Sequence, residues 1–321
     1  MTQRPPPPRH TLRKAETPAL SPADDLRDAL RRLLAEGVDH LLLNEPAARR
    51  GDAEAIHQMR VALRRLRAVL RLFRKLLDPA PVAALEDELR RLGRVLGDAR
   101  DWDVFCTETL PTIAAAGLGV LPARGALARA ANRERKRAHA GLRAVLRGGA
   151  VRELAERLRR WHATPALFAT DPGRPIGSVA IRQVAGLEKR VRRRARDLAR
   201  QDDEGRHRLR KALKTLRYGR DMLQALDEQT SAEGWLHPPS ARRATTRLQE
   251  ALGSLNDAVA ARALAQRLCE GDAGPAGSAL HRQGAVVERW SEQHRADALA
   301  ALPAGWEQFR QQALRKRGPS P

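Results

Sequence analysis

The stretch IHQMRVALRRLR, residues 56–67, returns in outline as RHRLRKALKTLR at residues 206–217. In each copy a His is followed by bases three, seven and ten positions later. These offsets keep four side chains on one side of an α-helix. The two sets are His57, Arg60, Arg64 and Arg67, and His207, Arg210, Lys214 and Arg217. A basic stripe that occurs twice in the same register predicts one shared site for a polyanion.

The first of these helices separates bases from apolar residues around its circumference. At about 100° per residue, one narrow arc holds five of the bases that follow His57, namely Arg60, Arg64, Arg67, Arg71 and Arg74, and apolar residues fill most of the remainder. No acid occurs between His57 and Leu77. We therefore expect this helix to be buried on most sides, with its basic strip facing a groove or cavity. Arg65 lies in the apolar arc and should need a buried acidic partner, for which Asp101 and Asp103 are the candidates.

The whole chain is strongly basic. Its 321 residues include 60 Lys and Arg against 38 Asp and Glu, which gives a formal charge of +22. This excess favours an anionic partner, whether nucleic acid, a membrane surface or inorganic phosphate. Only seven of the bases are Lys, and the planar fork of Arg matches phosphate oxygens bidentately.

Several classes of protein are disfavoured. No apolar run approaches the roughly 18–20 residues of a membrane span, so no membrane partner is expected. The Pro-rich N-terminus lacks the apolar stretch of a signal peptide. The two Cys, at positions 106 and 269, have no metal-ligand spacing, which indicates a reducing, cytoplasmic setting. Motifs of nucleotide hydrolases, serine hydrolases and zinc proteases are missing from the sequence, so no enzyme activity and no cofactor are predicted.

Ala, Leu, Arg and Glu dominate most segments, and the predicted fold class is all-α. The expected helices span residues 24–44, 54–77, 82–96, 101–115, 123–146, 151–162, 178–201, 204–227, 241–252, 257–269 and 277–301. A second shared landmark, LGDARD at 96–101 and LGSLND at 252–257, supports a tandem duplication. We expect two helical-bundle units related by an internal pseudo-two-fold axis around a basic cavity. The expected segments are a disordered Pro-rich arm (1–23), repeat 1 (24–150), a linker (163–177), repeat 2 (178–301) and a basic tail (302–321).

The paired motifs and both LG-containing turns resemble the CHAD family, helical domains named for their histidines. The resemblance covers about residues 20–300. It implies an all-helical domain with internal two-fold pseudosymmetry, a basic central cavity that binds inorganic polyphosphate, and association with cytoplasmic polyphosphate granules. Many members also carry a triphosphate-tunnel (CYTH) domain with a Glu-x-Glu-x-Lys strand. The nearest string here, EDELR at 86–90, has a helical context, which argues against an attached triphosphatase.

Carried over to this sequence, the resemblance predicts that the eight strip residues bind polyphosphate. Additional polyphosphate contacts are expected from a second group of bases, which comprises Arg71, Arg74, Arg182, Lys189 and Arg193. Nearby positive charge should keep the two histidines neutral. Their role is either a direct phosphate contact or a structural one.

Two further interpretations stay open. Asp98, Asp101 and Asp103 lack the spacing of a calcium loop, so no metal is expected, and Asp101 and Asp257 are predicted to cap helices after their LG turns.

The alternative to polyphosphate binding is a DNA- or RNA-binding protein, and weak nucleic-acid binding by charge is expected in any case. Aromatic residues make up only 3% of the chain, which provides few platforms for stacking single-stranded bases. The sequence does not indicate an oligomeric state.

Overall fold

The computed structural model describes residues 12–163, 174–224, 226, 239–271 and 278–313. Throughout this part the chain forms helices without a β-strand, so the predicted all-α class is confirmed. The first group of helices is α1 (Leu26–Arg49), α2 (Ala53–Phe73), α3 (Pro79–Val104), α4 (Leu110–Ala115), α5 (Ala126–Arg147) and α6 (Ala150–Ala163). The second group is α7 (Ile176–Arg194), α8 (Asp203–Met222), α10 (Pro239–Glu270) and α11 (Ala279–Ala313).

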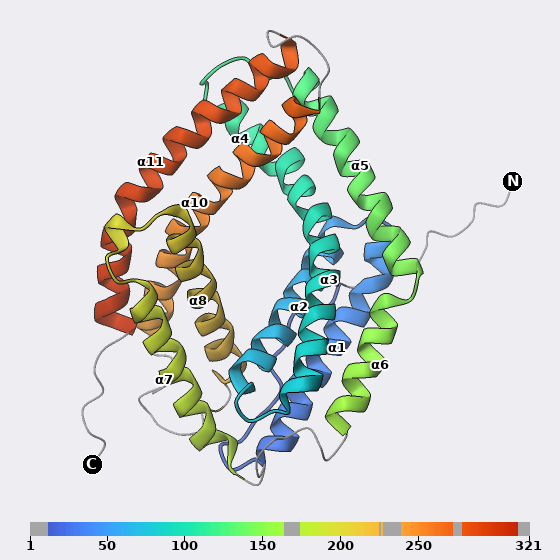
Figure 1. Cartoon of the computed structure of the whole chain (residues 1–321), viewed down its shortest axis with the longest axis vertical. Coiled ribbons are helices and arrows are strands. Elements are labelled where there is room, and N and C mark those ends of the chain that lie inside the picture. Colours follow the sequence, from blue (N-terminus) through green and yellow to red (C-terminus); the bar gives the residue numbers. More distant parts are fainter. Residues whose placement is uncertain (1–11, 164–173, 225, 227–238, 272–277, 314–321) are drawn as a thin grey trace, which may run out of the picture.

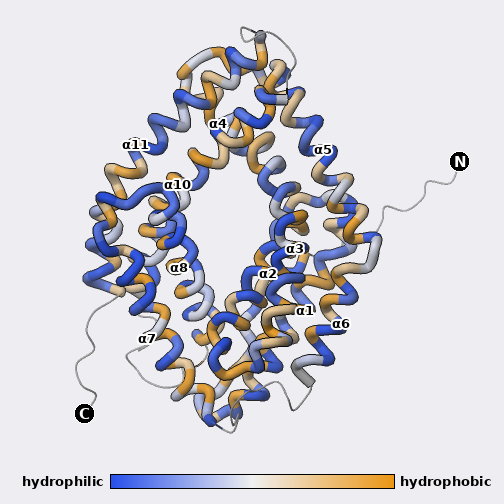
Figure 2. The backbone as a smooth tube through the Cα atoms, viewed as in Figure 1, coloured by the Kyte–Doolittle hydropathy of each residue, from blue (hydrophilic) through white to orange (hydrophobic). Residues whose placement is uncertain are grey.

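The two groups of helices stand on opposite sides of the molecule and meet at its two ends (Figure 1). At the upper end in that view, α4 and α5 approach α10 and α11, and a small apolar cluster that includes Trp102, Phe105 and Val287 joins them. At the lower end α2 contacts α8. Hydrophobic and hydrophilic positions alternate along the helices, including those that border the middle of the molecule (Figure 2). None of the described helices is long and apolar enough to cross a membrane.

The two basic helices start in the same way. Asp52 caps α2 by accepting a hydrogen bond from the backbone N–H of Ala55, and Asp202 caps α8 by accepting one from Gly205. Such caps stabilise a helix by about 1 kcal/mol. In each helix the strip His comes five residues after the capping Asp, so the caps fix both strips at the same register.

The predicted turns at 96–101 and 252–257 are wrong. α3 and α10 run through both segments without a break, so Asp101 and Asp257 lie inside helices and cap nothing. The cap of α3 is Asp78, and the helix gives way to a π-helical turn only at Phe105–Thr109. Glycine lowers helix propensity by about 1 kcal/mol relative to Ala, which favoured a break, but packing overrides this preference here.

The packed domain extends further at both ends than expected. Residues 12–23 belong to the predicted disordered arm, yet Leu20 is buried and Leu12 packs against the core. Arg13 pairs with Glu36 at 3.3 Å, which ties this segment to α1. α11 continues to Ala313 rather than ending at 301, because Leu302 and Phe309 remain buried. The rest of the predicted arm (1–11), the centre of the linker (164–173) and the end of the tail (314–321) lie outside the described residues.

Candidate functional site

The strips of α2 and α8 face each other. We call the eight residues defined above, four on each helix, the paired strip. The two helices meet at their C-terminal ends, where a Cβ on Gly219 would lie 3.7 Å from Leu72 Cδ1, and they diverge above this contact (Figure 1). Burial is the largest cause of a lowered pKa at Lys214, about 8, followed by the charges of Arg210 on the same helix and Arg64 on α2. Bases of both strips therefore lie within electrostatic reach of one another.

Most of the paired strip has no described carboxylate at ion-pair distance, although Asp257 acts electrostatically on Arg210 and Lys214. All eight residues are half-buried. Among the described residues, no carboxylate lies within ion-pair distance of Arg64, Arg67, Arg210, Lys214 or Arg217. Arg60 is the exception, with Nη2 3.6 Å from Oδ1 of Asp101.

Four of these arginines also leave a buried donor unused. The Nε atoms of Arg64, Arg67, Arg210 and Arg217 are buried without a hydrogen-bond partner. A buried polar group without a partner costs about 1–3 kcal/mol. The Nε atoms of Arg13, Arg49, Arg206 and Arg220 are also buried without a partner, but the strip gathers four such donors on two facing helices, which favours a ligand with several oxygen atoms there.

The two histidines have lowered pKa values, and burial is the largest cause for both. For His57 the charges of Arg100, Arg64 and Arg60 add to this effect, while Glu54 opposes it. The expectation of neutral histidines therefore agrees with the structure, although desolvation contributes more than the neighbouring cations. A neutral imidazole can donate one hydrogen bond and accept another.

Two residues of the LG landmarks border the strips and were not predicted as site residues. Arg100 acts electrostatically on both His57 and Arg60. Asn256, at the matching place of the second landmark, lines a cavity together with His207. Their equivalent positions in the two landmarks are the sequence signal that could have identified them.

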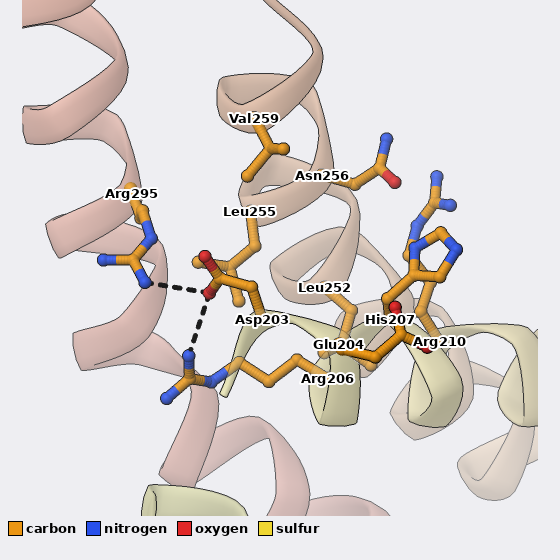
Figure 3. Close-up of a pocket in the computed structure, with 10 residues that line it drawn as sticks. All are labelled: Asp203, Glu204, Arg206, His207, Arg210, Leu252, Leu255, Asn256, Val259 and Arg295. Atoms are coloured by element: carbon orange, nitrogen blue, oxygen red, sulfur yellow. Dashed lines mark hydrogen bonds and ion pairs between the residues drawn. The ribbon is translucent and has the colours of Figure 1, made fainter. Parts of the chain in front are cut away.

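This cavity, of about 270 Å³, lies at the N-terminal end of α8 between α10 and α11 (Figure 3). It connects to the paired strip, since His207 and Arg210 belong to both. Leu252, Leu255 and Val259 supply its apolar wall. On the other side Asp203 Oδ1 accepts hydrogen bonds from Arg206 at 3.1 Å and Arg295 at 2.8 Å.

The five additional bases divide into two places. Arg71 and Arg74 continue the α2 strip to the surface; both are exposed, and Arg71 lies 3.8 Å from Glu86. The three on α7, Arg182, Lys189 and Arg193, are exposed as well. Their helix packs against the side of α8 that carries Gly219 and Arg220, so the structure does not bring them to the strip.

The acids expected near Arg65 have other partners. Arg65 Nη2 instead donates to the backbone carbonyl of Glu16, in the segment that was expected to be disordered. Asp103 is fully buried, where it accepts a 2.6 Å hydrogen bond from Arg135 Nε and lies 2.8 Å from His139 Nε2.

Asp98, Asp101 and Asp103 do not converge. Asp98 pairs with Arg267 and Asp101 with Arg60, whereas Asp103 is held in its own buried network. Within the described residues, no group of three or more acidic, His or Cys side chains is arranged to hold a metal ion.

Comparison with known proteins supports the all-α fold and identifies the family. The CHAD domain family model matches residues 23–266. The crystal structure of the CHAD domain from the plant Ricinus communis is 28% identical and has a TM-score of 0.68, with 97% of this chain and 99% of that chain covered. PptA from Streptomyces chartreusis shares the fold at 17% identity, with a TM-score of 0.65 and coverage of 88% and 100%.

Two uncharacterized Mycobacterium tuberculosis proteins, MT2285 and Rv2226, are each 40% identical over 78 residues. This match covers 24% of the chain and only 15% of the length of either curated relative. The family match, by contrast, extends over most of the chain, from the start of α1 to α10. This chain belongs to the CHAD domain family.

Proposed function

We propose that the chain binds inorganic polyphosphate in the paired strip and does not turn it over. The observation that carries this proposal is the set of buried, unused Nε donors at Arg64, Arg67, Arg210 and Arg217. On binding, the guanidinium groups would turn toward the phosphate oxygens, which would give these donors acceptors and would bring negative charge to ion-pair distance. Charge-assisted hydrogen bonds of this kind are about twice as strong as neutral ones.

The shape of the strip favours a thin polyanion. The strip residues are half-buried on facing helices, so a bulky polymer would meet the helix backbones before it reached all of them. From His57 to Arg74 the α2 bases extend over about 25 Å at roughly 1.5 Å per residue. A chain of linked phosphates carries dense charge along such a length and has no bases that need stacking partners.

Membership of the CHAD family supports the same ligand, because polyphosphate binding is what the resemblance implied. It also supports a cytoplasmic location at polyphosphate granules, which we include in the proposal. A fluorescent fusion of the full chain tests the location: it should coincide with stained granules, and the strip variant described next should spread through the cell.

Calorimetric titration with short and long polyphosphate tests the binding site. A strip variant, Arg64→Gln/Arg210→Gln/Lys214→Gln, should bind at least about 100-fold more weakly, since each charged hydrogen bond contributes about 1.5–3 kcal/mol. The matched control is Arg133→Gln/Lys136→Gln/Arg147→Gln on α5, which removes the same charge from exposed bases without ion pairs. The control should bind within threefold of the wild type. Equal losses of polyphosphate affinity in the two variants would mean that the protein attracts polyphosphate by its overall charge and has no specific site.

Two additional measurements separate this proposal from its alternatives. Incubation of polyphosphate with the protein and Mg²⁺ or Mn²⁺ should release no orthophosphate above background, and steady release would make the protein a hydrolase. Duplex DNA titrated under the same conditions should be insensitive to the strip variant. If DNA binding fell as far as polyphosphate binding, the strip would be a general polyanion site.

A further inference from the structure

The C-terminal part of α7 and the segment that follows it carry a second concentration of positive charge. Seven bases and a single acid, Asp197, occur between residues 189 and 200. All seven bases are exposed, and none has an ion pair with a described carboxylate. Many exposed arginines elsewhere do have such a partner, for example Arg159 with Asp39 at 3.0 Å and Arg262 with Glu288.

Three bases of α7 point away from the core. α7 buries Val184, Leu187 and Val191. At about 100° per residue, Arg182 and Lys189 fall on the opposite side of the helix, and so does Arg193. We call these three residues the outer α7 face.

The outer α7 face and the paired strip lie on opposite sides of the α7–α8 pair. α8 turns Gly219 and Arg220 toward α7: a Cβ on Gly219 would lie 3.1 Å from Leu187 Cδ1, and Arg220 Nη2 donates to Glu188 at 2.7 Å. By the same angular spacing, the α8 strip is rotated by roughly 150° from this contact. A ligand in the paired strip therefore leaves the outer α7 face uncovered.

We infer that the outer α7 face binds the phosphate backbone of double-stranded nucleic acid, independently of the paired strip. The face is exposed on the outside of a helix, where a polymer as wide as a duplex can reach it. Its three bases extend over about 16 Å along α7, a length of duplex that carries about ten phosphate charges. Residues 176–200 contain no aromatic side chain, which disfavours single strands, since these bind largely by base stacking. Backbone contacts alone carry no sequence information, so binding is non-specific.

Fluorescence anisotropy with a labelled 20-base-pair duplex tests this inference on the full chain. The variant Arg182→Gln/Lys189→Gln/Arg193→Gln should bind the duplex at least tenfold more weakly at low salt. It should also reduce the slope of log affinity against log salt by about 2.7, because each neutralised phosphate of B-DNA contributes about 0.9. The α5 control and the strip variant should each stay within threefold of the wild type, and circular dichroism verifies that all three remain helical.

Three results would overturn the inference. Equal weakening by the α7 and α5 variants would reduce DNA binding to diffuse charge. Loss of DNA binding in the strip variant would place both ligands at one site. An α7 variant that lost polyphosphate while it kept DNA would make the face an extension of the polyphosphate site. None of these results depends on whether the strip variant loses polyphosphate, so the failure of either proposal can be recognised separately.

Discussion

Gly97 on α3 lies directly against the guanidinium group of Arg60 on α2: a Cβ at position 97 would be 2.6 Å from Arg60 Nη1. The missing side chain lets this strip arginine lie along α3, with Nη2 3.6 Å from Asp101 four residues further on. At the matching place in the second landmark, a Cβ on Gly253 would meet nothing within 4 Å. Gly97 therefore positions a strip arginine, whereas Gly253, at the matching place in the second landmark, positions no neighbouring side chain.

Substitution by Ala should separate the two glycines. Gly97→Ala should displace the Arg60 guanidinium and weaken polyphosphate binding about three- to tenfold, whereas Gly253→Ala should leave affinity unchanged. Each Ala gains up to about 1 kcal/mol of helix propensity, so Gly253→Ala should unfold at a higher temperature. Titration calorimetry and thermal unfolding of both variants check this. Equal affinities would mean that Arg60 reaches its ligand equally well from a shifted position.

Polyphosphate affinity should fall as the pH rises above 8. Burial, with the charges of Arg210, Arg64 and Arg217, lowers the pKa of Lys214 to about 8. A bound anion favours the charged amine and raises that pKa, so complex formation takes up a proton above pH 8. If the bound pKa returns to the ordinary value of about 10.4, affinity should be about tenfold weaker at pH 9 than at pH 7.

Lys214→Arg provides the control for this pH dependence, since Arg stays charged at both pH values. Titrations of wild type and variant at pH 7 and 9 make the comparison. A tenfold loss that persisted in Lys214→Arg would assign the titration to a different group.

The unpaired charges of the paired strip should lower the stability of the free protein. Removing them in the Arg64→Gln/Arg210→Gln/Lys214→Gln variant should therefore raise the unfolding temperature without ligand. In the wild type, polyphosphate at about 100 times its Kd should add about 2.7 kcal/mol, a rise of several degrees. The variant should show no such rise. Differential scanning fluorimetry measures both, and a variant less stable than the wild type would show that these bases have structural roles.

The sequence predicted the elements that depend on local pattern. Helix periodicity located α2 and α8, and the repeated spacing from His57 and from His207 identified two strips that the fold brings together. Whether the halves arose by duplication around a basic cavity stays a prediction, which the matching caps Asp52 and Asp202 support.

Features that depend on distant contacts were not predictable in this way. Helix propensity is a local property, so Gly97 predicted the end of a helix. A side chain here would instead collide with Arg60 on α2, a contact that the local sequence does not reveal. Arg65 lacked an obvious partner because its acceptor is a backbone carbonyl, at Glu16, and carbonyls leave no sequence signal. The outward direction of Arg182, Lys189 and Arg193 became apparent only once the packing of α7 against α8 was known.

The buried carboxylate of Asp103 should matter for folding and not for the ligand. Burial alone would raise its pKa, but hydrogen bonds from His139 and Arg135 bring it below the ordinary value. Asp103→Ala leaves the Arg135 guanidinium and the His139 imidazole without their acceptor and should cost about 3–5 kcal/mol. Asp98→Ala, which removes an exposed 3.4 Å pair with Arg267, should cost about 1 kcal/mol or less.

The pH dependence of this difference follows from the lowered pKa. A depressed carboxyl pKa contributes stability that is present above the unfolded value, about 3.9, and is lost as pH falls through the folded value. Urea unfolding at pH 7 and at pH 3 measures the free energy of unfolding of wild type and both variants. The gap between wild type and Asp103→Ala should narrow toward pH 3, because protonation removes from the wild type the charge that the substitution has already removed. A gap of the same size at both pH values would mean that Asp103 stabilises the fold by packing and not as an anion.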